Sequence, residues 1–295
     1  MRSVALPRAA LVAGLALMAM GQSVLFAIFG PLGRDMGMSE VMVGGVISLA
    51  AIAVVLTSPW WGRQADRRGR RPVFLFAIGG LSATTLGFTL VLEAGRAGWL
   101  AGVGAFVLLA LARIVYGLSV TGAQPAASGW IADTTTEADR TGGMAMIGAA
   151  FGIGAILGPV LAWALSGFGL LVPLYTVSGL GLMVCVFAWF VLPESRRASI
   201  DESPTLKVSD PRLRVPLATT IAVFIVISGL QQTLAFYVQD LGDLDNAETA
   251  NRVGQTLALL AAVIFATQIT VAIRKPAPSI ILPIGLGAGA LGALV

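Results

Sequence analysis

GRQADRRGRR, residues 62–71, is a charged stretch that lies between two long apolar runs. It contains five arginines and one carboxylate, and its Gly62, Asp66 and Arg70 recur at intervals of four. Pro72 opens the following apolar run, as a proline at the first position of a helix would. An ordinary positively charged membrane loop would explain the arginines, but not the aspartate or the glycines at this spacing. The stretch therefore indicates a specific connection between two membrane-spanning helices.

The composition indicates a membrane protein. Hydrophobic residues make up 57% of the 295 residues and charged residues 12%, and the mean hydropathy is +0.88. Such a chain cannot present a solvated surface around a buried core. The net charge of +4 resides in short gaps between apolar runs, so we expect a lipid bilayer and no nucleic acid as its partner. The chain has no histidine and a single cysteine, Cys185, which excludes imidazole chemistry and a disulfide framework.

Apolar segments that could cross about 30 Å of hydrocarbon recur along the chain. They cover residues 9–28, 41–61, 73–92, 99–122, 142–165, 170–192, 215–238, 253–273 and 279–295. We therefore predict an all-α polytopic membrane protein of about nine helices. Its expected parts are a six-helix bundle at 1–192, a cytoplasmic linker at 193–214 and an incomplete second bundle of about three helices at 215–295.

Basic residues are divided unevenly between alternate gaps. Fifteen lysines and arginines fall in one set of gaps, and only Arg34, Arg96 and Arg252 fall in the other. Because lysine and arginine are concentrated on the cytoplasmic side, we expect the amino terminus, residues 62–71 and the linker to be cytoplasmic. The same orientation places the acidic loop 240–248 outside.

The 62–71 stretch resembles the loop signature of the major facilitator superfamily, in which it joins the second and third transmembrane helices on the cytoplasmic side. All of the signature's fixed positions, from Gly62 through Asp66 to Arg71, are present. Complete members have six helices in the second half, so this chain is expected to be either a fragment or a natural truncation. Because Asp133 follows the fourth span on the same side, we predict that Asp66, Arg70 and Asp133, with Gly62, form one gating charge cluster.

Arg113 is the one ionisable residue inside a predicted span. A charge at the centre of a membrane helix costs about 2.5 to 3.5 kcal/mol on insertion scales, so we expect it to face a cavity or a partner. The alternative is that its side chain reaches back to the cytoplasmic edge. Its surroundings, ARIVYG at 112–117, resemble the fourth-helix motif of the same superfamily.

The fifth span resembles the motif that the superfamily's exporters share, most of all the drug and tetracycline proton antiporters. Its expected helix-packing residues are Gly148, Gly152, Gly154, Gly158 and Pro159. Small residues four apart let helix backbones approach closely, which also happens in bundles without any transport function. Where the motif usually continues to a glycine pair, this chain has Ala162 and Trp163, so the resemblance is incomplete there.

The resemblance implies a central cavity built from the first, fourth, seventh and tenth helices. The candidates for its wall and for coupling are Arg113, Gln22, Tyr116, Gln231, Gln232 and Tyr237. An interhelical hydrogen bond or a packing contact would explain the glutamines and tyrosines equally well. No predicted span contains an interior carboxylate, so the proton-coupling residue is absent, unusual or located beyond Val295.

The implied function is secondary transport: export of small, mostly apolar molecules by alternating access, coupled to protons, from a multi-pass location in the plasma (inner) membrane. Two alternatives stay open, namely uptake of a metabolite by the same fold and a truncated membrane protein that does not transport. We expect no enzyme and no cofactor, because no metal-ligand cluster and no nucleophile with an adjacent base is visible. The sequence leaves the substrate and the oligomeric state open.

Overall fold

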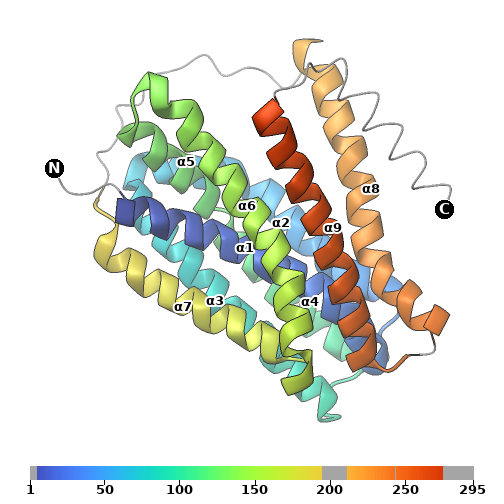
Figure 1. Cartoon of the computed structure of the whole chain (residues 1–295). Coiled ribbons are helices and arrows are strands. Elements are labelled where there is room, and N and C mark those ends of the chain that lie inside the picture. The colour runs from blue at the N-terminus through green and yellow to red at the C-terminus, as the bar shows by residue number, and fades with distance from the viewer. Residues whose placement is uncertain (1–4, 195–210, 243, 275–295) are drawn as a thin grey trace. The chain divides into compact units, whose positions relative to one another are not determined.

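A computed structural model describes residues 5–194, 211–242 and 244–274, and these residues are α-helical almost throughout. The helices are α1 (Ala5–Asp35), α2 (Glu40–Arg68), α3 (Arg70–Arg96), α4 (Gly102–Val120), α5 (Ala123–Thr134), α6 (Glu137–Leu165), α7 (Val172–Val191), α8 (Pro211–Gly242) and α9 (Asn246–Arg274), with a short 3₁₀ turn, η1 (Ser166–Phe168). No strand occurs within these ranges. In Figure 1 the helices are coloured by their position along the chain, from blue at the amino terminus to red towards the carboxyl terminus.

Six helical segments of the described residues are long and apolar enough to cross a membrane. They are Ala5–Asp35, Glu40–Arg68, Arg70–Arg96, Gly102–Thr134, Gly142–Phe168 and Val172–Val191. The prediction of an all-α, multi-spanning protein is thus confirmed. Helices α8 and α9 occupy the ranges predicted for the seventh and eighth spans. The ninth predicted span and most of the 193–214 linker lie outside the described residues, so the division into two bundles stays a prediction.

The charged stretch 62–71 forms two helix ends rather than an open loop. Helix α2 continues to Arg68 and α3 begins at Arg70, so that only Gly69 separates them. Gly69 has φ of 101°, a backbone conformation that glycine adopts without the strain a side chain would bring. The 29 residues of α2 extend about 43 Å at 1.5 Å per residue, more than the hydrocarbon core requires. The charged turns can therefore lie beyond it.

The fourth span is longer than the sequence predicted. Instead of ending at Gly122, the helical segment passes from α4 into α5 and continues to Thr134. A Cβ atom on Gly122 would lie 2.8 Å from Val73 Cγ1 and 3.0 Å from Trp61 Cε3, so the break between the helices is also a point of close packing. The continuation carries Asp133 to the end of α3 at which Arg70 lies.

Helix α1 packs against α6 and α7, and α3 packs against α4 and α7 (Figure 1). Two of the predicted packing glycines make the α1–α6 contact. A Cβ on Gly154 would lie 2.0 Å from Ala16 O, and one on Gly158 would lie 2.7 Å from Met20 O. By contrast, a Cβ on Gly148 would meet nothing within 4 Å. Gly152 is half-buried, and Pro159 is buried within α6.

Polar side chains link α3 to α7 inside the bundle. Ser82 Oγ donates to Ser178 O at 2.7 Å, and Ser178 Oγ donates to Ser82 O at 2.9 Å. Such reciprocal bonds stabilise helix pairs in an apolar surrounding.

Residues Met1–Ala258 form one compact unit, and Leu259–Val295 form a second. In the first unit, α8 packs against α1, where a Cβ on Gly30 would lie 3.1 Å from Ala235 Cβ. Of the second unit, the structure describes only the continuation of α9 to Arg274.

Candidate functional site

Asp66, Arg70 and Asp133, which we call the hinge cluster, lie together at the ends of α2, α3 and α5. Arg70 is only 9% exposed. Its Nη1 pairs with Asp66, one helical turn earlier in the chain, and its Nε lies 3.5 Å from Asp133 Oδ2. One guanidinium therefore ties together three helix ends in the geometry suited to two carboxylates.

Gly129 supports this cluster, a role that the sequence analysis did not assign. A Cβ on Gly129 would lie 2.4 Å from both Cζ and Nε of Arg70, so the guanidinium packs directly on the α5 backbone. Gly62, predicted as a member of the cluster, lies on α2 one turn before Asp66, and a Cβ there would meet nothing within 4 Å. In the sequence, the only indication of this role is that Gly129 lies one helical turn before Asp133, on the same helix face.

Arg113 is buried in α4 and is 7% exposed. Its Nη2 donates to Gln22 Oε1 of α1 at 2.7 Å, and its Cζ lies 4.2 Å from the ring centre of Tyr116. Its Nε is buried and makes no hydrogen bond to the described residues. The adjoining void of about 10 Å³ is also lined by residues of α1, α3 and α7, and is about large enough for one water molecule.

A larger cavity of about 350 Å³, which we call the Ser58 pocket, lies between α1, α2, α4 and α5. Its lining residues are Met18, Val54, Ser58, Val120, Thr121, Gln124, Pro125 and Ser128. A cavity of a few hundred Å³ that is lined mainly by apolar groups, with a few polar ones, is typical of a small-molecule site. The serines and the glutamine of this pocket belong to no recognisable sequence motif, so the pocket was not predicted from the sequence.

The predicted cavity residues of α8 lie elsewhere. Tyr237 is 64% exposed. Gln232 is half-buried, and its Oε1 would lie 3.6 Å from a Cβ on Gly44 of α2. The side chain of Gln231 lies outside the described part of the structure. Neither described residue lines the Ser58 pocket.

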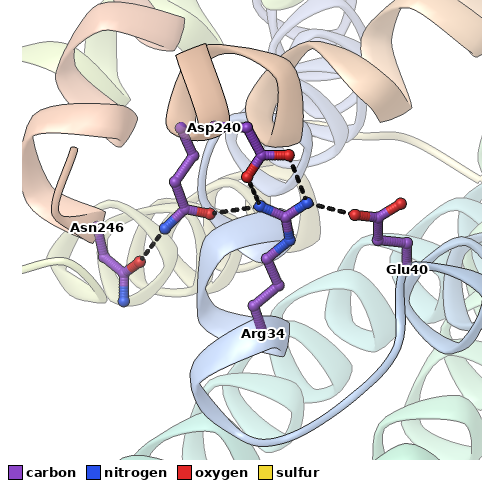
Figure 2. A network of polar contacts seen from close by, with 5 residues as sticks. Arg34, Glu40, Asp240 and Asn246 are labelled. Carbon is purple, nitrogen blue, oxygen red and sulfur yellow. Dashed lines mark hydrogen bonds and ion pairs between the residues drawn. The ribbon is translucent and has the colours of Figure 1, made fainter. Parts of the chain in front are cut away.

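A second charge cluster lies at the other end of α2. It joins Arg34, Glu40 and Asp240, and we call it the Arg34 cluster (Figure 2). Arg34 Nη2 donates to Asp240 Oδ2 at 3.0 Å, its Nη1 pairs with the other oxygen of the same carboxylate, and its Nη2 also pairs with Glu40. The arginine therefore holds the end of α8 against the α1–α2 connection with a two-pronged contact.

Further contacts extend this cluster. Arg34 Cζ lies 4.6 Å from the ring centre of Phe236. Gln239 Nε2 donates to Asn246 Oδ1 at 3.0 Å (Figure 2). Asn246 Nδ2 also donates to Asp35. The hydrogen bond from Arg34 lowers the pKa of the Asp240 carboxyl, because it favours the charged form.

The Arg34 cluster was not predicted from the sequence, in which Arg34 indicated only the orientation of the chain. Arg34 and Asp240 are 206 positions apart, and no motif joins them. The described residues contain no cluster of three or more His, Cys, Asp or Glu side chains that could hold a metal ion.

The chain resembles known resistance proteins over much of its length. It is 31% identical over 170 residues to multidrug resistance protein 2 of Bacillus subtilis (strain 168), a match covering 57% of this chain and 39% of that protein. It is 30% identical to the class B tetracycline resistance protein of Escherichia coli, covering 71% of this chain and 50% of the relative. For the class E protein of Escherichia coli the identity is 30%, with 82% and 59% covered. The chain thus spans about half the length of these relatives.

Solved structures share the fold. A bacterial homolog of the human lysosomal transporter Spinster, in an inward-facing and occupied conformation, matches with a TM-score of 0.63 at 18% identity, covering 88% of this chain and 59% of that one. A D-xylose–proton symporter matches with a TM-score of 0.59 at 15% identity, covering 91% and 69%. The family model of the Major Facilitator Superfamily matches residues 11–295. The chain is a multi-pass membrane protein that belongs to the Major Facilitator Superfamily.

Proposed function

We propose that this chain exports small, mostly apolar molecules by alternating access, as part of a proton-coupled secondary transporter. The observation that carries the proposal is the placement of the Ser58 pocket relative to the Arg34 cluster. Ser58 lies ten residues before the end of α2 at Arg68, which is about 15 Å along the helix. The pocket is therefore nearer the hinge end, while Arg34 pairs with α2 and α8 at the opposite end.

Such an arrangement suits a state open towards the predicted cytoplasmic side. The Spinster homolog of similar fold was solved in an inward-facing conformation. The multidrug and tetracycline resistance relatives favour export as the direction and drug-like molecules as the substrates. The superfamily consists of transporters, and we propose that this chain likewise moves its substrate without changing it chemically.

Proton coupling requires a group that can take up and release a proton during the transport cycle. Among the carboxylates of the described residues, Asp66, Asp133, Asp240 and Glu40 lie in clusters at helix ends. Arg113 is the buried charge at membrane depth, and we propose that it stabilises an acid of the substrate or of the chain during coupling. On this proposal Arg113→Lys impairs transport nearly as much as Arg113→Ala, because lysine lacks the planar fork.

The proposal is tested with inverted membrane vesicles from cells that express the gene encoding this chain. Uptake of tetracycline should follow an imposed pH gradient, acidic inside. Ser58→Phe fills the pocket and should lower uptake several-fold, whereas Thr176→Val removes only a bond within α7 and should leave it unchanged. Equal uptake by the parent and Ser58→Phe would show that the Ser58 pocket does not bind the substrate. Uptake without a pH gradient would show that transport is not coupled to protons.

Metabolite uptake is the second candidate, favoured by the similarity to a D-xylose–proton symporter. The same vesicles separate the two directions when the pH gradient is reversed. We further propose a plasma (inner) membrane location with a cytoplasmic amino terminus. Cysteines placed at Arg67 and Thr205 should then react from the cytoplasm and one at Asp243 from outside, although Thr205 and Asp243 lie outside the described residues.

A further inference from the structure

A groove of about 640 Å³ lies between the beginning of α3 and the end of α7, separate from the Ser58 pocket. Its lining residues are Arg68, Gly69, Arg71, Pro72, Leu75, Phe76, Cys185, Trp189 and Glu194. Two arginines and one carboxylate thus lie at one end of an otherwise apolar surface. This combination fits a ligand with a negative head and a hydrocarbon body.

Arg71 is anchored at the mouth of this groove. Its Nη2 donates to Trp189 O at 2.6 Å, its Cζ lies 5.5 Å from the Trp189 ring centre, and its Nη1 lies 3.5 Å from Glu194 Oε1. The Glu194 side chain is 82% exposed, so a stronger anion can replace it at small cost. The Nε of Arg71 is buried and makes no hydrogen bond to the described residues, so an incoming anion would meet the outer Nη1 and Nη2 groups.

Two other features add positive potential at the same place. Arg68 is exposed and forms no ion pair within the described ranges. The first turn of α3 begins next to it at Arg70 and has no side-chain cap. The positive end of the α3 helix dipole therefore adjoins two arginine side chains and favours an anion there.

The body of the groove is an exposed apolar surface. Phe76 is 56% exposed and Trp189 is 60% exposed, on α3 and α7, which are both long and apolar enough to span a membrane. A tryptophan beside arginines at the end of such a helix is typical of the membrane–water interface. A soluble anion would gain nothing from this apolar wall, whereas an acyl chain would be buried against it.

We propose that this groove binds an anionic phospholipid, with the headgroup phosphate on Arg68 and Arg71 and an acyl chain along Leu75, Phe76 and Trp189. Basic pockets between helices on the cytoplasmic side recognise such headgroups. The hinge arginines then have two tasks. Arg70 turns inward to the hinge cluster, while Arg68 and Arg71 face the lipid.

The binding is tested by mass spectrometry of lipids that remain bound to the chain after extraction from nanodiscs of mixed phosphatidylglycerol and phosphatidylcholine. The single variants Arg68→Ala and Arg71→Ala should each lower the enrichment of phosphatidylglycerol about fivefold, because one basic residue near an anionic lipid surface contributes an attraction of about that size. The matched control is Arg63→Ala/Arg67→Ala, which removes two exposed hinge charges outside the groove and should retain the parental enrichment. Parental enrichment in Arg68→Ala/Arg71→Ala would overturn the proposal.

Cys185 provides a second readout, because it lines the groove and is the only cysteine of the chain. Phosphatidylglycerol should slow its alkylation in the parent and not in Arg68→Glu, a change at an exposed side chain that leaves the Arg71–Trp189 bond intact. Equal protection by inorganic phosphate would show a general anion site and contradict the lipid assignment. Efficient disulfide trapping of Cys185 by cysteines at Asp201 or Glu202 would show that the linker fills the groove, which would also contradict it.

Discussion

The hinge cluster and the Arg34 cluster both place one arginine between two carboxylates, but they differ in what they join and in how deeply they are buried. Arg70 has a side chain 11% exposed and connects α2, α3 and α5. Arg34 has a side chain 24% exposed, and it connects the α1–α2 region with α8, whose Asp240 is 65% exposed. The first cluster is part of a packed bundle, whereas the second can separate and be rehydrated at little cost.

This difference assigns different tasks to the two ends of α2. A contact that must break in each transport cycle should be worth little more than thermal energy, because a stronger one would trap a single state. The exposed carboxylates of the Arg34 cluster meet that requirement. The buried guanidinium at the hinge holds three helix ends, and we predict that its partly exposed carboxylates, at 48% for Asp66 and 34% for Asp133, set the balance between transport states.

The largest effect should come from crowding the hinge cluster. Gly129→Val places atoms where the Arg70 guanidinium lies, so it should destabilise the purified protein by about 1 to 3 kcal/mol, the usual cost of overpacking, and lower its unfolding temperature. Gly62→Ala is the matched control: a Cβ there meets nothing within 4 Å, and alanine favours helix. Unfolding temperatures that fall equally in both variants would show that Arg70 does not depend on Gly129.

A smaller effect is expected when one hinge carboxylate loses its charge. Asp66→Asn keeps the shape and weakens one ion pair, worth about 0 to 1 kcal/mol at a partly exposed position. We expect expression to be intact and vesicle flux to fall by up to about fivefold, because that energy is comparable to the balance between transport states. Arg63→Gln changes an exposed neighbouring charge and serves as the control. Flux equal to the parent's would end the gating role of the hinge cluster.

External acidity should have the smallest effect, and it should leave the Arg34 cluster closed. Arg34 lowers the pKa of Asp240 from the ordinary value of 3.8, so the contact is at full strength above that value and is lost only as the pH falls through the lowered pKa. Asp240 faces the guanidinium of Arg34. The side chains of Glu40 and Gln239 accept hydrogen bonds from the same guanidinium. The labelling rate of a cysteine at Leu241, divided at each pH by the rate for the same thiol in the unfolded protein to correct for the thiolate fraction, should be flat from neutral pH down to about 4. Labelling that rises in mildly acidic buffer would instead make the cluster a proton switch.

The comparison also shows what the sequence could predict. Asp66 and Arg70 are one helical turn apart and carry a recognisable signature, and Asp133 followed from the membrane side on which its span ends. Gly154 and Gly158 were likewise predictable, because their spacing sets the close approach of α6 to α1. Local spacing and membrane sidedness are both properties of the linear chain.

Contacts that depend on tertiary packing were not predictable in this way. Only the docking of α8 on α1 brings Asp240 to Arg34, because the two residues are 206 positions apart in the chain. The Ser58 pocket depends on α5 continuing the fourth span past Gly122, where a glycine suggested an end. Gly148 has the same spacing, but a Cβ there would meet nothing within 4 Å. Spacing alone does not determine which face of a helix contacts a neighbouring helix.

The most direct test of the Arg34 cluster as a reversible closure is a distance between spin labels at Val41 and Leu241, measured in a Cys185→Ser background. Both positions are exposed, at 84% and 75%, and they flank the cluster on α2 and α8. The parent should show one short distance, and Asp240→Asn should add a second, longer one. The charge swap Arg34→Asp/Asp240→Arg, with Glu40→Gln to remove the opposing carboxylate, should restore the short distance. The same distribution in the parent and Asp240→Asn, or a swap that behaves like the single variant, would contradict this account.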